Sequence, residues 1–242
     1  MKVRVQSKER IAETVAQIII DLVKENPKAV LGLATGSSPL GVYANLVKAY
    51  ENNEVSFKEV TTFNLDEYVG LDENNEQSYR YFMNHNLFDH IDIDKANTHV
   101  PCGTEGYEEK AAQYDELIEQ AGGIDLQILG IGTDGHIAFN EPGTPFDSLT
   151  HVADLAESTI QDNSRFFEKV EDVPTKAVTM GLASIMRAKR IILIATGENK
   201  ADAIKALLLG LITDKWPCTV LRTNPQLEVT IFVDHEAASK IK

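Results

Sequence analysis

Residues 126–142 read LQILGIGTDGHIAFNEP and give the clearest indication of the architecture. This stretch begins as an apolar run typical of a buried strand and continues into a loop with three glycines, two acids and one histidine. In α/β proteins the reactive groups gather on loops at the carboxyl ends of parallel strands. Asp134, His136 and Glu141 are therefore candidate acid–base residues. A turn with solvated acids is the alternative, and polar loops after other predicted strands disfavour it.

Strands and helices alternate on both sides of this stretch. Strands are predicted at 29–33, 60–65, 125–131, 190–195 and 229–233, and helices at 39–50, 77–88, 107–120 and 200–211. A further amphipathic helix within residues 1–20 places Ile11, Val15, Ile18 and Ile19 on one face. Alternation with strands rich in Val, Ile and Leu predicts a mostly parallel sheet covered on both faces. We expect a three-layer α/β/α, Rossmann-like single domain over residues 1–242.

The segment 143–178 interrupts this alternation. The region from Glu141 onward contains Pro142, Pro145 and Pro174, a weak strand near 150–155 and a short helical pattern at 163–170. A long excursion beside the histidine loop is a candidate lid. A surface insertion without function fits the pattern equally well.

Composition excludes several classes of protein. The 242 residues, 43% of them hydrophobic, can bury one full core. Acidic residues outnumber basic ones, 37 to 23, and no basic block is present, so nucleic acid and anionic membranes are poor partners. The N-terminal segment is too polar for a signal peptide and too short to span a bilayer.

The cysteines and histidines predict no metal and a reducing compartment. Cys102 and Cys218 lie far apart without a ligand-like or disulfide-framework spacing, which favours a cytoplasmic protein. The histidines outside the opening stretch have no ligand-like spacing either; they are His85, His90, His99, His151 and His235.

Two further strand ends suit a phosphate group. In Thr35-Gly36-Ser37-Ser38-Pro39, Pro39 fits the first helical position, Ser38 fits the cap, and Gly36 lets successive N–H groups turn toward one point. The loop is not a Walker loop because no lysine follows the glycine.

The loop at 196–200 ends in Lys200, which is predicted in the first turn of a helix. A cation there opposes the helix dipole, which suggests an anion nearby. Arg165, between aromatic residues in the candidate lid, is by itself an ordinary surface arginine.

Asp66 ends the strand in Phe63-Asn64-Leu65-Asp66-Glu67-Tyr68. A free aspartate has a pKa of about 3.9, so such a group is ionised at neutral pH and can take a proton from a carbon beside a carbonyl. Asp66 or Glu67 could equally cap the following segment, and the sequence does not choose between them.

Gly130, Gly132 and Gly135 also satisfy the dinucleotide pattern G-x-G-x-x-G, with Asp154 near the place of a ribose-binding acid. That motif needs a helix that starts within the glycines. The proline-containing sequence that follows cannot sustain one. Nucleotide binding is therefore disfavoured.

Four motifs together resemble the glucosamine-6-phosphate deaminase family. They are LGLATGSSP at 31–39, FNLDEY at 63–68, GTDGHIAFNEP at 132–142 and NSRFF at 163–167, and the similarity runs essentially end to end. The resemblance implies conversion of glucosamine 6-phosphate and water to fructose 6-phosphate and ammonium, without metal or organic cofactor.

The resemblance also implies roles for individual residues. His136, oriented by Asp134 and Glu141, would open the pyranose ring, and Asp66 would move a proton from C2 to C1. The phosphate would be held by residues of three segments: Thr35, Gly36, Ser37 and Ser38, then Arg165, then Lys200.

The chain departs from the allosteric, hexameric members of that family. Residues 144–154 contain no Lys or Arg, and the chain stops at Lys242. We therefore expect a non-allosteric form and favour a monomer over a homo-oligomer. The competing functions are a 6-phosphogluconolactonase, a galactosamine-6-phosphate isomerase and a sugar-phosphate-sensing domain of a transcription regulator. The last is disfavoured because no basic helix is available for DNA.

Overall fold

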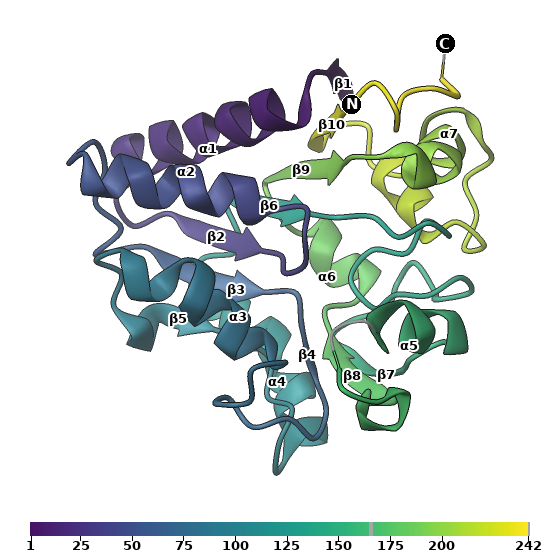
Figure 1. The fold of residues 1–242 in the computed structure, drawn as a ribbon, viewed down its shortest axis with the longest axis horizontal. Helices are drawn as coiled ribbons and strands as arrows, with labels where there is room; N and C mark the ends of the chain where they lie inside the picture. The colour runs from purple at the N-terminus through teal and green to yellow at the C-terminus, as the bar shows by residue number, and fades with distance from the viewer. Residues whose placement is uncertain (165–166, 242) are drawn as a thin grey trace.

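The computed structural model describes residues 1–164 and 167–241, which form a seven-stranded parallel sheet (Figure 1). The strand order is β1-β10-β9-β6-β2-β3-β5. The strands are β1 (Lys2–Val5), β2 (Val30–Leu33), β3 (Thr61–Asn64), β5 (Thr98–His99), β6 (Leu126–Leu129), β9 (Arg190–Ala195) and β10 (Glu228–Val233). All neighbouring strands of this sheet are parallel, so the predicted mostly parallel sheet is confirmed.

Helices cover both faces of the sheet, as predicted. One face packs against α1 (Lys8–Glu25), α2 (Leu40–Glu51) and α3 (Tyr79–Asn86), and the other against α4 (Tyr107–Gln120), α6 (Leu182–Met186) and α7 (Ala201–Leu209). Short 3₁₀ helices are η1 (Phe88–His90), η2 (Lys95–Asn97), η4 (Val170–Asp172), η5 (Glu198–Lys200) and η6 (Pro217–Arg222). Within the described part of the chain, none of the helices is both long and apolar enough to cross a membrane.

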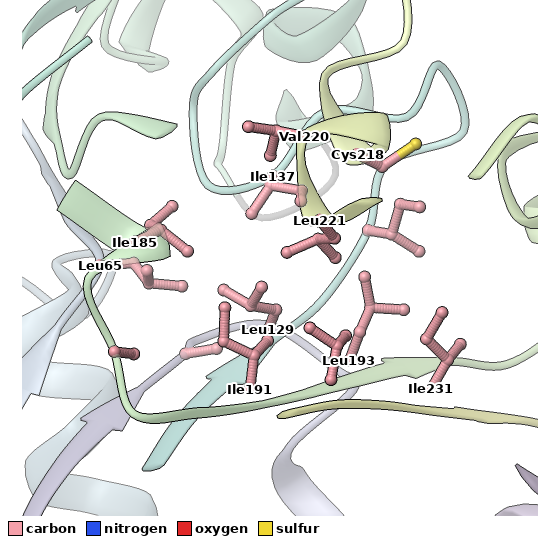
Figure 2. Close-up of a cluster of buried hydrophobic side chains, with 14 of the residues drawn as sticks. Leu65, Leu129, Ile137, Ile185, Ile191, Leu193, Cys218, Val220, Leu221 and Ile231 are labelled. Atoms are coloured by element: carbon pink, nitrogen blue, oxygen red, sulfur yellow. The ribbon is translucent and has the colours of Figure 1, made fainter. Parts of the chain in front are cut away.

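One core cluster reaches from the sheet up to the histidine loop (Figure 2). Leu129, Leu193 and Ile231 contribute from the strands, while Ile137 and Val220 pack on them from the loop side. Ile137 follows His136 directly in the chain and is completely buried. Burial of such a side chain is worth about 1.5–3 kcal/mol, so core packing fixes the backbone beside the histidine.

The segment expected as a lid contributes two strands to a second, antiparallel sheet. Its order is β4-β8-β7, with β4 (Asp66–Tyr68), β7 (His151–Asp154) and β8 (Lys176–Thr179). Only Leu65 separates β3 from β4, so the chain passes directly from the main sheet into the second one.

The helix of this segment lies earlier than predicted. The helical pattern was expected at 163–170, whereas α5 spans Glu157–Asn163. Its position follows from packing: Ile160 lies against a small cluster that contains Tyr68, Phe139 and Leu155. That contact joins residues far apart in sequence, so no local pattern reveals it. The weak strand expected near 150–155 is confirmed as β7.

Candidate active site

Four loops meet at one edge of the main sheet. Strands β9, β6, β2 and β3 are consecutive neighbours and all parallel, so the loops after them lie side by side. The chain leaves β2 toward β3 on one side, whereas β6 lies on the other side, which makes this a topological switch point. A Cβ atom placed on Gly130 would lie 3.7 Å from Ser38 Oγ, so the loop after β6 lies directly beside the loop after β2.

The loop after β2 has the backbone expected of a phosphate loop, with one correction. Gly36 has a φ of +83°, a conformation that favours glycine. Ser38 is not the helix cap, because the cap of α2 falls on Pro39, whose carbonyl accepts the first helical bond from the Tyr43 N–H. The first N–H groups of α2 have no acceptor within the helix and can bind an anion.

The loop after β9 places Lys200 beside the start of a helix. Lys200 ends η5 and occupies the cap position of α7, one position before the first turn in which it was expected. Gly197 has a φ of +94°, and its N–H donates to the Asp234 carboxylate at 2.9 Å. Arg165, the other cation predicted to hold the phosphate, lies outside the described residues.

The loop after β6 brings the three predicted acid–base residues together. His136 Nδ1 lies 2.7 Å from Asp134 Oδ1 and 3.6 Å from Glu141 Oε2. Burial would raise the pKa of Asp134, but the His136 ring and the His136 backbone N–H lower it to about 2. Asp134 is therefore an ionised group that faces Nδ1, and Nε2 is the imidazole nitrogen left for a ligand.

The histidine loop is held rigidly. A Cβ atom on Gly132 would lie 2.3 Å from the His136 ring, so only glycine leaves room for the imidazole. Asn140, which is completely buried, donates from Nδ2 to the Ile137 and Met180 carbonyls at 2.9 and 2.8 Å. Preorganised groups of this kind make acid–base chemistry efficient.

The structure separates the roles of the neighbouring acids Asp66 and Glu67. Glu67 accepts the Tyr79 and Arg80 N–H groups at 2.9 Å each, so it satisfies the amino end of α3. The Asp66 carboxyl has no hydrogen bond to any of the described residues. Burial first, and the nearby Glu67 second, raise its pKa to about 8.

A shared segment connects Asp66 to the histidine loop. Asp66 is paired with Thr179 across the second sheet. Thr179 Oγ1 accepts the Phe139 N–H at 3.1 Å, and the next carbonyl, that of Met180, accepts from Asn140. Residues 179–180 therefore contact both the strand that carries Asp66 and the loop that carries His136.

The donor set also matches what a metal ion would need. One ligand atom each from Asp134, His136 and Glu141 lie within 4.8 Å of one another. Imidazole and carboxylate donors suit zinc, with an open position for a further ligand. The same geometry suits an acid–base relay, and the expectation of no metal stays a prediction.

A hollow of about 530 Å³ lies elsewhere, on the outer face of α7. Its walls include Lys205 and Trp216, and Thr133 is the residue it shares with the histidine loop. The predicted site residues do not line it, so the site is identified by its chemistry and not by a volume.

Thr159 makes a polar contact with Glu141 that the sequence did not reveal. Its Oγ1 donates to Glu141 Oε1 at 2.5 Å. It comes from α5, whose position depends on tertiary packing, so no spacing rule could have found it.

Comparisons with known proteins agree with this geometry. Residues 4–231 match the family described as glucosamine-6-phosphate isomerases/6-phosphogluconolactonase. The glucosamine-6-phosphate deaminase of Thermoanaerobacter pseudethanolicus is 54% identical, over 96% of this chain and 92% of that protein. The protein of the same name from Mycoplasma mycoides is 52% identical, over 98% and 95%.

Solved structures show the same architecture. A monomeric glucosamine-6-phosphate deaminase superposes with a TM-score of 0.96 at 43% identity, over 99% of this chain and 100% of that one. A 6-phosphogluconolactonase of Thermotoga maritima has a TM-score of 0.76 at 22% identity, over 96% and 99%, which shows the shared fold. The chain belongs to the family of glucosamine-6-phosphate isomerases and 6-phosphogluconolactonases.

Proposed function

We propose that the protein converts glucosamine 6-phosphate and water into fructose 6-phosphate and ammonium. Relatives that carry the name of this deaminase are more than half identical over nearly the whole chain. The observation that carries the proposal is that two separate proton-transfer groups, Asp66 and His136, follow β3 and β6 at one edge of the main sheet and are linked through Thr179. The reaction has two proton tasks, and they need groups with different environments.

His136 carries out the first task, opening of the pyranose ring. The imidazole takes the proton of the C1 hydroxyl and returns a proton to the ring oxygen, so that the C1 aldehyde forms. Asp134 faces Nδ1 at 2.7 Å, which fixes the ring orientation and stabilises the imidazolium formed in between.

Asp66 carries out the second task, isomerisation. Its carboxylate removes the proton from C2 of the open chain and delivers a proton to C1 through an enolamine. The product is an imine at C2, which water hydrolyses to the ketone and ammonium. Burial and the nearby Glu67 raise the pKa of Asp66 to about 8. A bound substrate ammonium group favours the ionised carboxylate, because opposite charges at close range lower such a pKa.

The phosphate group is assigned to the loops after β2 and β9. The backbone and hydroxyl groups of Thr35, Gly36, Ser37 and Ser38 and the cation of Lys200 would hold it, together with Arg165. Support comes from the positive φ of Gly36, the unpaired first turn of α2 and the place of Lys200 at the α7 cap.

The segment 143–178 is proposed as the lid over this site. Support comes from Thr159, which reaches from α5 to Glu141, and from the cluster in which Ile160 packs near Tyr68 and Phe139. A lid in this position excludes water from the reacting carbons until the imine is hydrolysed.

The protein is further proposed to be a non-allosteric monomer. Support comes from the absence of lysine and arginine in 144–154 and from the 43% identical solved deaminase, which is itself monomeric. Sedimentation at micromolar concentration should give one species of about 27 kDa. Saturation curves should be hyperbolic and indifferent to N-acetylglucosamine 6-phosphate.

Ammonium release tests the proposed reaction against its competitors. Glucosamine 6-phosphate, galactosamine 6-phosphate and 6-phosphogluconolactone are assayed in parallel with the purified protein. The proposal expects ammonium from glucosamine 6-phosphate and its loss in Asp66→Asn. Lactone hydrolysis that survives Asp66→Asn, with no ammonium from either aminosugar, would assign the chain to the lactonases instead.

A further inference from the structure

We infer that Thr159 is a positioning residue for ring opening, acting through Glu141 on His136. The inference rests on the proposed function. It extends that function by adding a group from outside the histidine loop. It also gives the segment 143–178 a defined contact with the proton-transfer machinery.

The two oxygens of the Glu141 carboxylate face different partners. Oε1 accepts the Thr159 hydroxyl at 2.5 Å, and Oε2 lies 3.6 Å from His136 Nδ1. A hydroxyl bonded to an ionised carboxylate gives one of the stronger and shorter hydrogen bonds in proteins. Because one oxygen is held, rotation about the last side-chain bond is restricted and the other oxygen stays directed at the imidazole.

Among the described residues, the Thr159 hydroxyl is the one hydrogen-bond donor to the Glu141 side chain. Oε2 is buried and lacks a hydrogen-bond donor within that part of the protein, although His136 Nδ1 is near. Without the Thr159 bond, the carboxylate could turn away from His136 at little cost. The imidazole would then have Asp134 as its single anionic partner.

Packing fixes where the hydroxyl lies. Thr159 is 7% exposed, and its neighbour Ile160 packs against the cluster that contains Tyr68 and Phe139. Tyr68 follows Asp66 by two positions in β4, and Phe139 belongs to the histidine loop. The same short helix therefore packs through Ile160 against the cluster to which both proton-transfer elements contribute, and contacts Glu141 through Thr159.

The test compares Thr159→Val with Thr159→Ser. Valine keeps the branched shape but removes the donor, and serine keeps the donor. The inference expects Thr159→Val to lower kcat for glucosamine 6-phosphate by about 10- to 100-fold, the usual cost of a hydrogen bond to a charged group. Thr159→Ser should retain most of the wild-type kcat.

Thr150→Val is the matched control. Thr150 precedes β7 in the same segment and is also buried, but its hydroxyl has no hydrogen-bond partner among the described residues. Its kcat should equal that of the wild type. Equal losses in Thr150→Val and Thr159→Val would assign the effect to packing of the segment and overturn the inference.

Two readouts separate positioning from misfolding. Affinity for 2-amino-2-deoxyglucitol 6-phosphate, an open-chain analogue with no ring to open, should be unchanged in Thr159→Val. If valine abolishes this binding, Thr159→Ala is used in its place. In a Glu141→Gln background the Thr159 substitution should cause little further loss, because residues that act as one unit are non-additive.

The inference can fail while the proposed function stands. A wild-type protein that releases ammonium, together with a Thr159→Val variant of unchanged kcat, would overturn only the role of Thr159. Independent, multiplicative losses from Thr159→Val and Glu141→Gln would do the same. A wild-type protein that releases no ammonium would overturn the proposed function itself.

Discussion

Asp66→Asn should make the substrate-free protein more stable, by an amount that depends on pH. The pKa of Asp66 is raised from 3.8 to about 8 in the folded state, first by burial and then by Glu67. Between these pH values the folded protein keeps a proton on Asp66 that the unfolded chain has released. Folding then costs free energy, and the cost grows as pH rises.

The size of this cost follows from linkage. Each pH unit between the two pKa values changes the free energy of unfolding by about 1.4 kcal/mol. The cost is absent below about pH 4 and complete above about pH 8. From pH 5 to pH 8 the wild type should therefore lose about 4 kcal/mol relative to Asp66→Asn, since asparagine has nearly the same shape and does not titrate.

Urea unfolding of both proteins at pH 5, 6, 7 and 8 measures this difference. Titration of groups remote from position 66 is common to the two proteins and cancels, whereas the adjacent Glu67 is coupled to Asp66 and its titration is part of the measured difference. Asp154→Asn controls for the loss of a negative charge, since the Asp154 side chain is 87% exposed on the same small sheet. A wild-type-minus-variant difference that stays constant from pH 5 to pH 8 would refute the account of Asp66 as a buried, uncompensated acid.

Three other predictions use the same geometry. The wild-type kcat/KM for glucosamine 6-phosphate should rise as pH increases through about 8, because the free enzyme must ionise Asp66 to act as a base; a profile already flat from pH 6 upward would contradict this. Gly132→Ala should lower kcat by about 100-fold, because its Cβ would lie 2.3 Å from the His136 ring; steady-state kinetics with wild-type activity would show that the ring can move freely. Asn140→Ala should lower the free energy of unfolding by about 1–3 kcal/mol through loss of its bonds to the Ile137 and Met180 carbonyls, and an unchanged urea midpoint would count against the role of this side chain.

The main sheet was predictable where apolar runs mark buried strands. The residues of β2, β6 and β9 are almost all buried, and their apolar sequences predict that burial. In contrast, β1 is exposed along its whole length and β5 has only two residues, so neither strand shows an apolar run in the sequence. In the second sheet the sequence predicts β7, whereas β4 and β8 pair with each other over a long distance in sequence, which no local pattern reveals.

The sequence predicted which loops form the site but not how their side chains are arranged. The clustering of Asp134, His136 and Glu141 follows from their closeness in sequence and is confirmed. The choice between Asp66 and Glu67 needed the structure, because the N–H groups that Glu67 caps lie 12 and 13 residues away. Thr159 lies 18 residues from Glu141, and a distance of that length in sequence carries no periodic signal.

The shared role of Asp66 and His136 can be tested with a structure of the protein bound to 2-amino-2-deoxyglucitol 6-phosphate. In that role, two strand ends bring a carboxylate and an imidazole to different atoms of one six-carbon sugar phosphate. The account predicts the phosphate against residues 36–38 and Lys200. It also predicts the Asp66 carboxyl beside C1 and C2, and His136 within about 3.2 Å of the C5 oxygen. Asp66 and His136 too far apart to contact the same bound molecule would contradict it.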